Sequence, residues 1–170
     1  MINILFVCLG NICRSPIAEG VFRDLVEREG LSKKIKCDSA GTASYHIGSL
    51  PDRRMRQIAW ENDIELNHKS RKLAGDDFYN FDYIVAMDEA NFQDIRNQSY
   101  RSSGFYFPED KLFLFREFDP ELIKPDDTAQ LSVPDPYYED IAVFDEVYRI
   151  VVRCGAQFLE YLVEKNQLKK

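Results

Sequence analysis

Apolar and polar positions alternate along this chain in two distinct ways. Residues 2–8 are apolar apart from Asn3 and predict a buried strand. Shorter runs rich in apolar, aromatic or β-branched residues at 35–40, 81–87 and 111–115 predict three more strands. Between these runs the apolar residues recur three or four positions apart, which is typical of helices packed against a sheet.

The first helix is predicted directly after the first strand. Ser15 suits an N-cap, Pro16 suits the first helical turn, and Gly30 is placed for a C-terminal cap. Further helices are predicted over 52–63 and 89–97. The clearest helical stripe lies near the C-terminus and comprises Phe144, Val147, Tyr148, Val151, Phe158, Leu159 and Leu162.

Strands that alternate with helices predict an α/β fold, a three-layer sandwich with a parallel sheet and helices on both faces. No repeat or linker divides the chain, so residues 1–166 are expected to form one domain and 167–170 a frayed tail. Ligands of such folds bind beyond the carboxyl ends of the strands. Cys8, Ser39 and Asp88 lie at the ends of predicted strands, so the sequence predicts a site at that edge.

The loop at this edge carries the chemistry of an anion site. A short loop between a strand and a helix directs backbone N–H groups at one point, where the helix N-terminus adds partial positive charge. Gly10 allows close approach of the backbone, and Arg14 can hold two phosphate oxygens. Such a site would also stabilise a thiolate on Cys8, which predicts phosphoryl transfer through a cysteine.

The composition restricts the possible partners and cellular location of the protein. The net charge of −7 argues against nucleic acid as a partner, although one concentrated positive site can still bind an anion. No run approaches the length of a membrane span, and the N-terminus lacks the basic region of a signal peptide. The four cysteines have no zinc-like spacing, and a core of this size does not need disulfides. We expect a cytoplasmic protein without membrane insertion.

Cleavage of a phosphate monoester at such a site also needs a proton donor for the leaving oxygen. Asp135 lies between Pro134 and Pro136, and Tyr137 and Tyr138 follow at once. These residues could form a stiff acid loop with an aromatic slot, or simply a proline-rich turn with half-buried tyrosines. Asp135 is one of 29 acidic residues, so its chemistry alone does not decide between these two interpretations.

The segments 8–16 and 135–138 resemble those of low molecular weight protein tyrosine phosphatases. The likeness extends over nearly the whole chain through four further motifs, at 38–42, 68–71, 81–84 and 86–91. The resemblance implies a four-stranded parallel sheet in the order 2-1-3-4 and a protein tyrosine phosphatase that hydrolyses aryl phosphate monoesters through a phosphocysteine. It implies neither a cofactor nor a metal.

The resemblance also implies roles for particular residues. Cys8 would be the nucleophile, Arg14 the phosphate clamp and Asp135 the general acid. The phosphate-binding residues would be Leu9, Gly10, Asn11, Ile12, Cys13, Arg14 and Ser15. The loop would be supported by Asn11, Ser15, Ser39, His68 and Asp88. The substrate ring would meet Ile12, Tyr45, Tyr137 and Tyr138. His46 has no counterpart and is expected to face solvent, while Cys37 and Cys154 are expected in the core.

The sequence supports three alternative functions less well. Phosphoarginine phosphatases share the fold but typically carry Thr where this chain has Ile12. Arsenate reductases need further redox cysteines after the third strand, and none lies between Cys37 and Cys154. An inactive phosphotyrosine-binding module should lack the nucleophile, the clamp or the acid. The expected partners are phosphotyrosine proteins, with a tyrosine kinase among the candidates, and the chain is expected to be a monomer or weak dimer.

The chain departs from compact family members between about residues 104 and 133. This segment contains a cluster of aromatic residues, namely Phe105, Tyr106, Phe107, Phe113, Phe115 and Phe118. We expect additional packing around the fourth strand, and the alternative is a surface that binds a partner. By the same resemblance, Cys13 could form a protective disulfide with Cys8 on oxidation, and Tyr137 and Tyr138 could be phosphorylated.

Overall fold

The computed structural model describes residues 1–122 and 128–169 and contains a four-stranded sheet in the order β2-β1-β3-β4. Its strands are β1 (Ile2–Cys8), β2 (Ile35–Gly41), β3 (Tyr83–Ala86) and β4 (Leu112–Leu114). All three strand pairings are parallel. The predicted sheet and its order are therefore confirmed.

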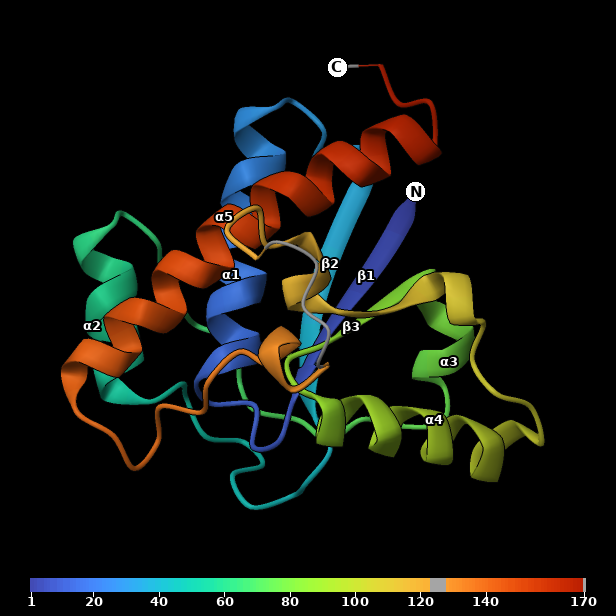
Figure 1. The fold of residues 1–170 in the computed structure, drawn as a ribbon, viewed down its shortest axis with the longest axis horizontal. Coiled ribbons are helices and arrows are strands. Elements are labelled where there is room, and N and C mark those ends of the chain that lie inside the picture. Colours follow the sequence, from blue (N-terminus) through green and yellow to red (C-terminus); the bar gives the residue numbers. More distant parts are fainter. Residues whose placement is uncertain (123–127, 170) are drawn as a thin grey trace.

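Two layers of helices cover the sheet (Figure 1). One face of β1 packs in a core shared with α1 (Arg14–Arg28), α2 (Arg53–Glu61) and the long α5 (Ile141–Lys165). The opposite face packs against α3 (Asp77–Asn80) and α4 (Glu89–Ser103). The division follows the alternation within β1, since Ile4 and Phe6 belong to the first core and Leu5 and Val7 to the second.

Several predicted boundaries are wrong by a few residues. Helix α1 begins at Arg14, Cys13 occupies the N-cap, and no side chain caps this end. Ser15 is therefore not the cap. Its hydroxyl instead contacts Cys8 and Asn11 in the loop that precedes the helix. Helix α4 continues to Ser103, well past residue 97, and ends at Gly104 with φ +78°. Helix α3 was not predicted. Gly30, with φ +69°, ends α1 as expected.

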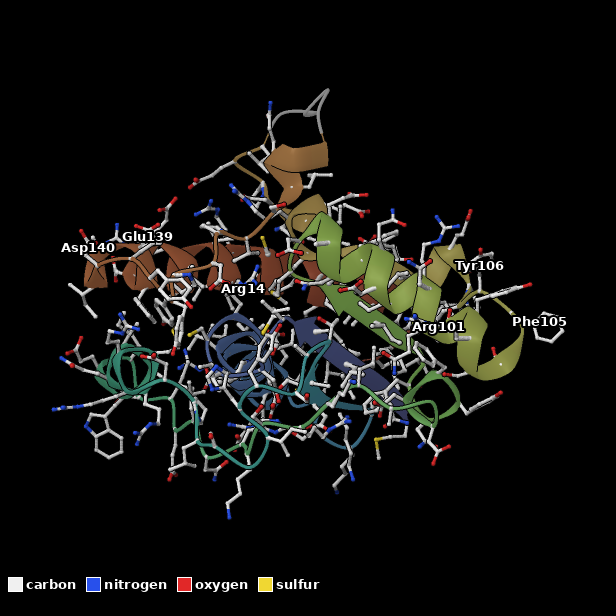
Figure 2. The ribbon with its side chains drawn as sticks, turned by 90° about the horizontal axis from the view of Figure 1, so that it is seen from below. Arg14, Arg101, Phe105, Tyr106, Glu139 and Asp140 are labelled. Atoms are coloured by element: carbon white, nitrogen blue, oxygen red, sulfur yellow. The ribbon has the colours of Figure 1, made fainter. Side chains whose placement is uncertain are left out.

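Most of the aromatic cluster in 104–133 packs inward. Phe113 and Phe118 contact Phe158 of α5 with ring centroids 6.2 and 4.9 Å apart, and Phe115 is fully buried. This supports the expectation of additional packing around β4. Phe105 and Tyr106 remain exposed at the end of α4 (Figure 2). The segment also includes three short 3-10 turns, Glu109–Lys111, Phe115–Phe118 and Thr128–Leu131. Residues 123–127 lie outside the described residues.

Asp119 anchors this segment to α5. Its carboxylate is fully buried and pairs with Arg153 at 2.7 Å and Arg116 at 3.0 Å. Arg116 also donates to the carbonyl of Ser132 at 3.2 Å, just before the stretch that contains Asp135. The packing therefore fixes the start of the predicted acid loop.

None of the helices in the described part of the chain is both long and apolar enough to cross a membrane. Helix α5 ends at Lys165, next to the predicted domain boundary at residue 166. The division into residues 1–166 and a tail at 167–170 stays a prediction.

Candidate active site

The loop between β1 and α1 closes around the sulfur of Cys8. The backbone N–H of Asn11 donates to Cys8 Sγ at 3.3 Å, and the Ser15 hydroxyl lies 3.0 Å from the same atom. Asn11 has φ +54°, a left-handed conformation that is strained for most non-glycine residues. The loop therefore curls around Cys8 at the expense of backbone strain, which other contacts must offset.

The Asn11 side chain supplies those contacts. Its amide nitrogen donates to Ser15 Oγ at 2.8 Å and to Ser39 Oγ at 3.0 Å. Its amide oxygen accepts from the backbone N–H of Arg71 at 3.0 Å and lies 2.9 Å from His68 Nε2. Asn11, Ser15 and Ser39 are fully buried. The structure thus brings together four of the side chains predicted to support the loop, those of Asn11, Ser15, Ser39 and His68, with the backbone of Arg71 in addition.

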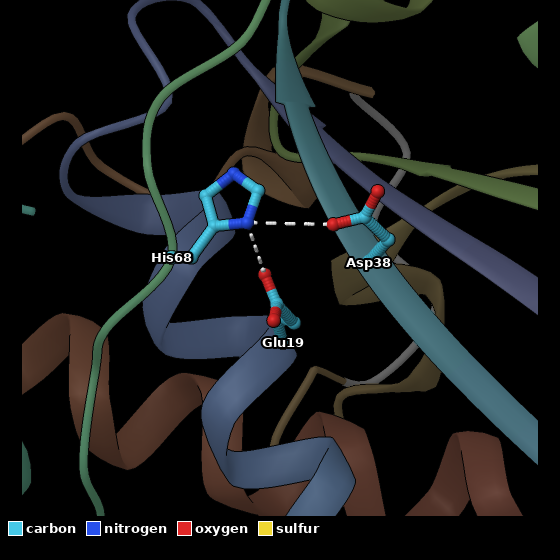
Figure 3. Close-up of side chains that lie close together, drawn as sticks. All are labelled: Glu19, Asp38 and His68. Atoms are coloured by element: carbon cyan, nitrogen blue, oxygen red, sulfur yellow. Dashed lines mark ion pairs between the residues drawn. The ribbon is translucent and has the colours of Figure 1, made fainter. Parts of the chain in front are cut away.

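His68 connects this network to two carboxylates (Figure 3). Because Asn11 Oδ1 can only accept, His68 Nε2 carries the proton of their hydrogen bond. His68 Nδ1 lies 3.4 Å from both Glu19 Oε2 and Asp38 Oδ1. Burial raises the pKa of Glu19, while the hydrogen bond from Ser39 and the nearby His68 oppose that shift.

Within the described residues, Glu19, Asp38 and His68 form a cluster with the residue types that could ligate a metal ion. Their ligand atoms all lie within 4.8 Å of one another. However, Glu19 Oε2 accepts from Ser39 Oγ at 2.7 Å, and the His68 ring holds Asn11. The cluster therefore serves as the outer support of the loop.

Arg14 is the first residue of α1 and lies near the middle of the molecule (Figure 2). Its Nη1 donates to Asp88 Oδ2 at 2.7 Å and to the carbonyl of Val133 at 3.2 Å. Its Nη2 donates to Asp135 Oδ2 at 3.3 Å. Burial opposes the charge of Arg14, but Cys8, Asp135 and Asp88 outweigh it and raise the pKa of the guanidinium. Arg14 is therefore a fixed cation that is 3% exposed.

The two cysteines of the loop differ in their surroundings. Burial, followed by the charge of Asp52, raises the pKa of the Cys13 thiol well above its ordinary value. Cys13 therefore stays protonated, whereas Cys8 receives a backbone N–H and lies beside the Ser15 hydroxyl. Cys154 is fully buried and Cys37 packs partly buried against the core, in line with expectation.

The pocket above Cys8 has the predicted walls. It is lined by Cys8, Leu9, Gly10, Ile12, Cys13, Arg14, Tyr45, His46, Asp135, Tyr137 and Tyr138. The expectation that His46 faces solvent is wrong. The ring of His46 is half-buried and lies 5.8 Å from the ring of Tyr137, because residues 42–48 fold back over the loop.

Sequence reasoning missed Glu19, Arg71 and Arg54. Glu19 lies one helical turn after Ser15, so the helical spacing could have placed it on the face that meets β2. Arg71 is fixed by Asp77, which lies six residues further along the chain, at 3.0 Å and by the more distant Asp38, 33 residues before it, at 2.9 Å. Arg54 bridges to the stretch after Asp135. No local pattern signals either arginine.

Gly41 gives a direct test of how tightly the loop is held. A Cβ at Gly41 would lie 2.7 Å from the carbonyl oxygen of Leu9 and 3.2 Å from the backbone nitrogen of Asn11. Gly41→Ala should therefore push the loop away and lower stability by about 1–3 kcal/mol, with weaker binding of inorganic phosphate. Chemical denaturation and phosphate titration measure both effects.

Gly75→Ala is the matched control, since its Cβ would only approach the Ser102 side chain at 3.3 Å. Equal phosphate affinity in both variants would contradict the proposed tight contact between β2 and the loop.

The fold and this pocket define an α/β phosphate-binding protein whose binding loop begins with a cysteine. The chain belongs to the low molecular weight phosphotyrosine protein phosphatase family, whose model matches residues 3–168. A chicken (Gallus gallus) low molecular weight phosphotyrosine protein phosphatase is 43% identical over 158 residues, covering 93% of this chain and 94% of the relative. The predicted family and enzyme class are therefore confirmed.

Solved structures agree with this assignment. A protein tyrosine phosphatase from Entamoeba histolytica superposes with a TM-score of 0.82 at 36% identity, covering 99% of this chain and 100% of that one. A Drosophila arginine phosphatase also superposes with a TM-score of 0.82, at 30% identity, covering 93% of this chain and 96% of that one. The fold is therefore shared by phosphatases named for different phosphoamino acids.

Proposed function

We propose that this protein hydrolyses phosphotyrosine in proteins through a phosphocysteine intermediate on Cys8. The observation that carries the proposal is the meeting of three groups in one aromatic-walled pocket. Cys8, Arg14 and Asp135 all line it, although they come from the first strand, the first helix and a loop far along the sequence. A nucleophile, an oxyanion clamp and a proton donor are what cleavage of a phosphate monoester requires.

In the first step, the Cys8 thiolate attacks phosphorus in line with the leaving phenolic oxygen. The S–P bond forms, the P–O bond to the tyrosine ring breaks, and protonated Asp135 gives its proton to the departing oxygen. The loop N–H groups and Arg14 hold the three remaining phosphoryl oxygens. A phosphate in this position competes with Asp135 for Arg14 Nη2, which now lies 3.3 Å from Asp135 Oδ2.

In the second step, water attacks the phosphorus of phosphocysteine. The Asp135 carboxylate takes a proton from that water, the S–P bond breaks, and inorganic phosphate leaves with the Cys8 thiolate restored. The Ser15 hydroxyl lies 3.0 Å from Sγ and is placed to donate to the thiolate as it departs. Neither step calls for a metal ion.

The walls of the pocket favour an aromatic leaving group. Ile12 offers an apolar side chain in place of the Thr typical of phosphoarginine phosphatases, and Tyr45, Tyr137 and Tyr138 line the pocket with it. An aromatic ring can pack between such side chains, whereas a guanidinium would leave its N–H donors facing an apolar residue. The structural likeness to a Drosophila arginine phosphatase keeps phosphoarginine as the second candidate substrate.

Steady-state hydrolysis of a phosphotyrosine peptide and of the same peptide with phosphoarginine tests this proposal. We expect kcat/KM for phosphotyrosine to be higher by about 10²-fold or more, as for a site lacking partners for a polar substrate group. The assay contains a reductant and a chelator. A higher kcat/KM for phosphoarginine would overturn the substrate assignment, and no turnover of either peptide would overturn the phosphatase itself.

We further propose that the protein is cytoplasmic, monomeric or weakly dimeric, and acts on phosphotyrosine proteins that include a tyrosine kinase. All four cysteines carry free thiols, which suits a reducing compartment. An Asp135→Ala variant used as a trap in lysate, with vanadate added as a competitor, would capture the substrates. The kinase assignment fails if the proteins displaced by vanadate include no tyrosine kinase.

A further inference from the structure

Residues 135–140 form the acid-bearing stretch, which carries Asp135 and is largely exposed to solvent. The Asp135 side chain is 47% exposed, and Tyr138, three residues later, is 93% exposed. Asp135 Oδ1 accepts from the backbone N–H of Tyr137 at 3.2 Å, so its position depends on the backbone at residue 137. Glu139 and Asp140 follow at the surface, where α5 begins (Figure 2).

Arg54 of α2 holds this backbone. Its Nη2 donates to the carbonyl of Tyr137 at 2.9 Å, and its Nη1 donates to the carbonyl of Glu139 at 3.3 Å. The guanidinium also lies over the ring of Phe144 in α5, 4.3 Å from the centroid. One planar group thus ties two carbonyls of the acid-bearing stretch to the start of α5.

Arg54 is in turn held from the side of the phosphate loop. Asp52 Oδ2 accepts from Arg54 Nη2 at 3.0 Å, and Asp52 Oδ1 accepts from Arg54 Nε at 3.1 Å. The backbone N–H of Asp52 donates to the carbonyl of Ile12 at 2.7 Å. Hydrogen bonds therefore run from the phosphate loop through Asp52 and Arg54 to the backbone beside Asp135. The hydrogen bond to Asp52 raises the pKa of Arg54, so the guanidinium stays charged.

We infer that Arg54 is a positioning residue that sets the reach of Asp135 toward the leaving oxygen by bridging the phosphate loop and the acid-bearing stretch. This inference rests on the proposed role of Asp135 as proton donor. Arg54 does not line the pocket. Its loss should therefore affect proton transfer while leaving the phosphate loop itself in place.

A series of aryl phosphates with phenols of rising pKa separates these effects. In the first step a good leaving group needs little protonation, whereas a poor one depends on Asp135. Arg54→Gln should lower kcat/KM by roughly ten- to a hundredfold for the poorest leaving groups, as for a catalytic group misplaced by about 1 Å. For p-nitrophenyl phosphate the loss should stay within about threefold, and inorganic phosphate should inhibit as before.

Two further variants sharpen the comparison. Arg53→Gln removes the same charge from the neighbouring, exposed position of α2 and should match the parent in every measurement. Arg54→Lys keeps the charge but not the planar pair of donors, and should recover only part of the loss with poor leaving groups. A thermal melt of each variant accompanies the kinetics.

The inference is overturned if Arg54→Gln shows the same dependence on leaving-group pKa as Arg53→Gln, or loses activity equally for all substrates. Asp135→Asn serves as the reference in the same series. If Asp135→Asn itself leaves that dependence unchanged, the proposed role of Asp135 fails instead, so the two failures are distinguishable.

Discussion

Cys8→Ser is expected to lower kcat by about four orders of magnitude or more, as for removal of a catalytic nucleophile. Serine fits the space of Cys8 beside Ser15 and under the N–H of Asn11, so the pocket should keep its shape. Its hydroxyl, however, is not ionised at neutral pH, and the groups hydrogen-bonded at this position, the Asn11 N–H and the Ser15 hydroxyl, cannot act as its base. The remaining loop should still bind phosphate.

Two measurements separate lost chemistry from lost structure. Turnover of p-nitrophenyl phosphate reports the chemistry, and calorimetric titration with inorganic phosphate or vanadate reports the loop. Cys154→Ala is the matched control, because Cys154 is a buried thiol in α5, away from the pocket. Turnover by Cys8→Ser within tenfold of the parent would refute the nucleophile, whereas loss of phosphate binding would show that the loop had collapsed.

The fold was predictable because its elements carry strong local patterns. Strand β1 is a nearly continuous apolar run and the stripe of α5 keeps helical spacing over many residues, and the structure buries both in the core. The weak points were ends and short elements. Helix α4 continues to Ser103 over mainly polar residues, and the four-residue α3 has no periodic pattern. Tertiary packing decides these elements, so a local pattern could not.

The site was predictable where its functional residues lie close together in the sequence. Cys8, Asn11 and Arg14 share one loop, and the resemblance supplied Ser39 and Asp88, which the structure brings to it. The partners that act through long-range contacts were not visible. Glu19 looks like an ordinary helix-surface residue, yet it is 6% exposed because β2 and His68 cover it.

His46 illustrates the same difficulty from the opposite side. A lone histidine in a polar loop usually faces water, and only the folding of residues 42–48 over Gly10 brings its ring to the pocket rim. The ring lies so close that a Cβ at Gly10 would be 3.1 Å from His46 Cδ2. The path of this loop depends on backbone hydrogen bonds from Thr42 to Cys8 and from Ala43 to Leu9, both 2.9 Å.

Asp135→Asn is expected to lower kcat/KM by about 10²- to 10⁴-fold for alkyl-like or other poor leaving groups, and far less for p-nitrophenyl phosphate. Asparagine keeps the shape and can still accept from the N–H of Tyr137, so the loop should stay in place. It cannot give up a proton to a phenolate, however. It also removes one anion beside Arg14, so phosphate should bind at least as tightly as in the parent.

The second step gives an independent check of the same residue. Asp135 is proposed to take a proton from the water that attacks phosphocysteine, so Asp135→Asn should accumulate that intermediate when a good leaving group loads it. A rapid-quench burst of p-nitrophenol, followed by a slow steady state, measures this directly. The neighbouring Glu139→Gln is the matched control, since Glu139 is exposed and only its backbone carbonyl contacts Arg54. A variant at Asp135 with parent-like dependence on the leaving group and no burst would place the proton donor elsewhere in the pocket.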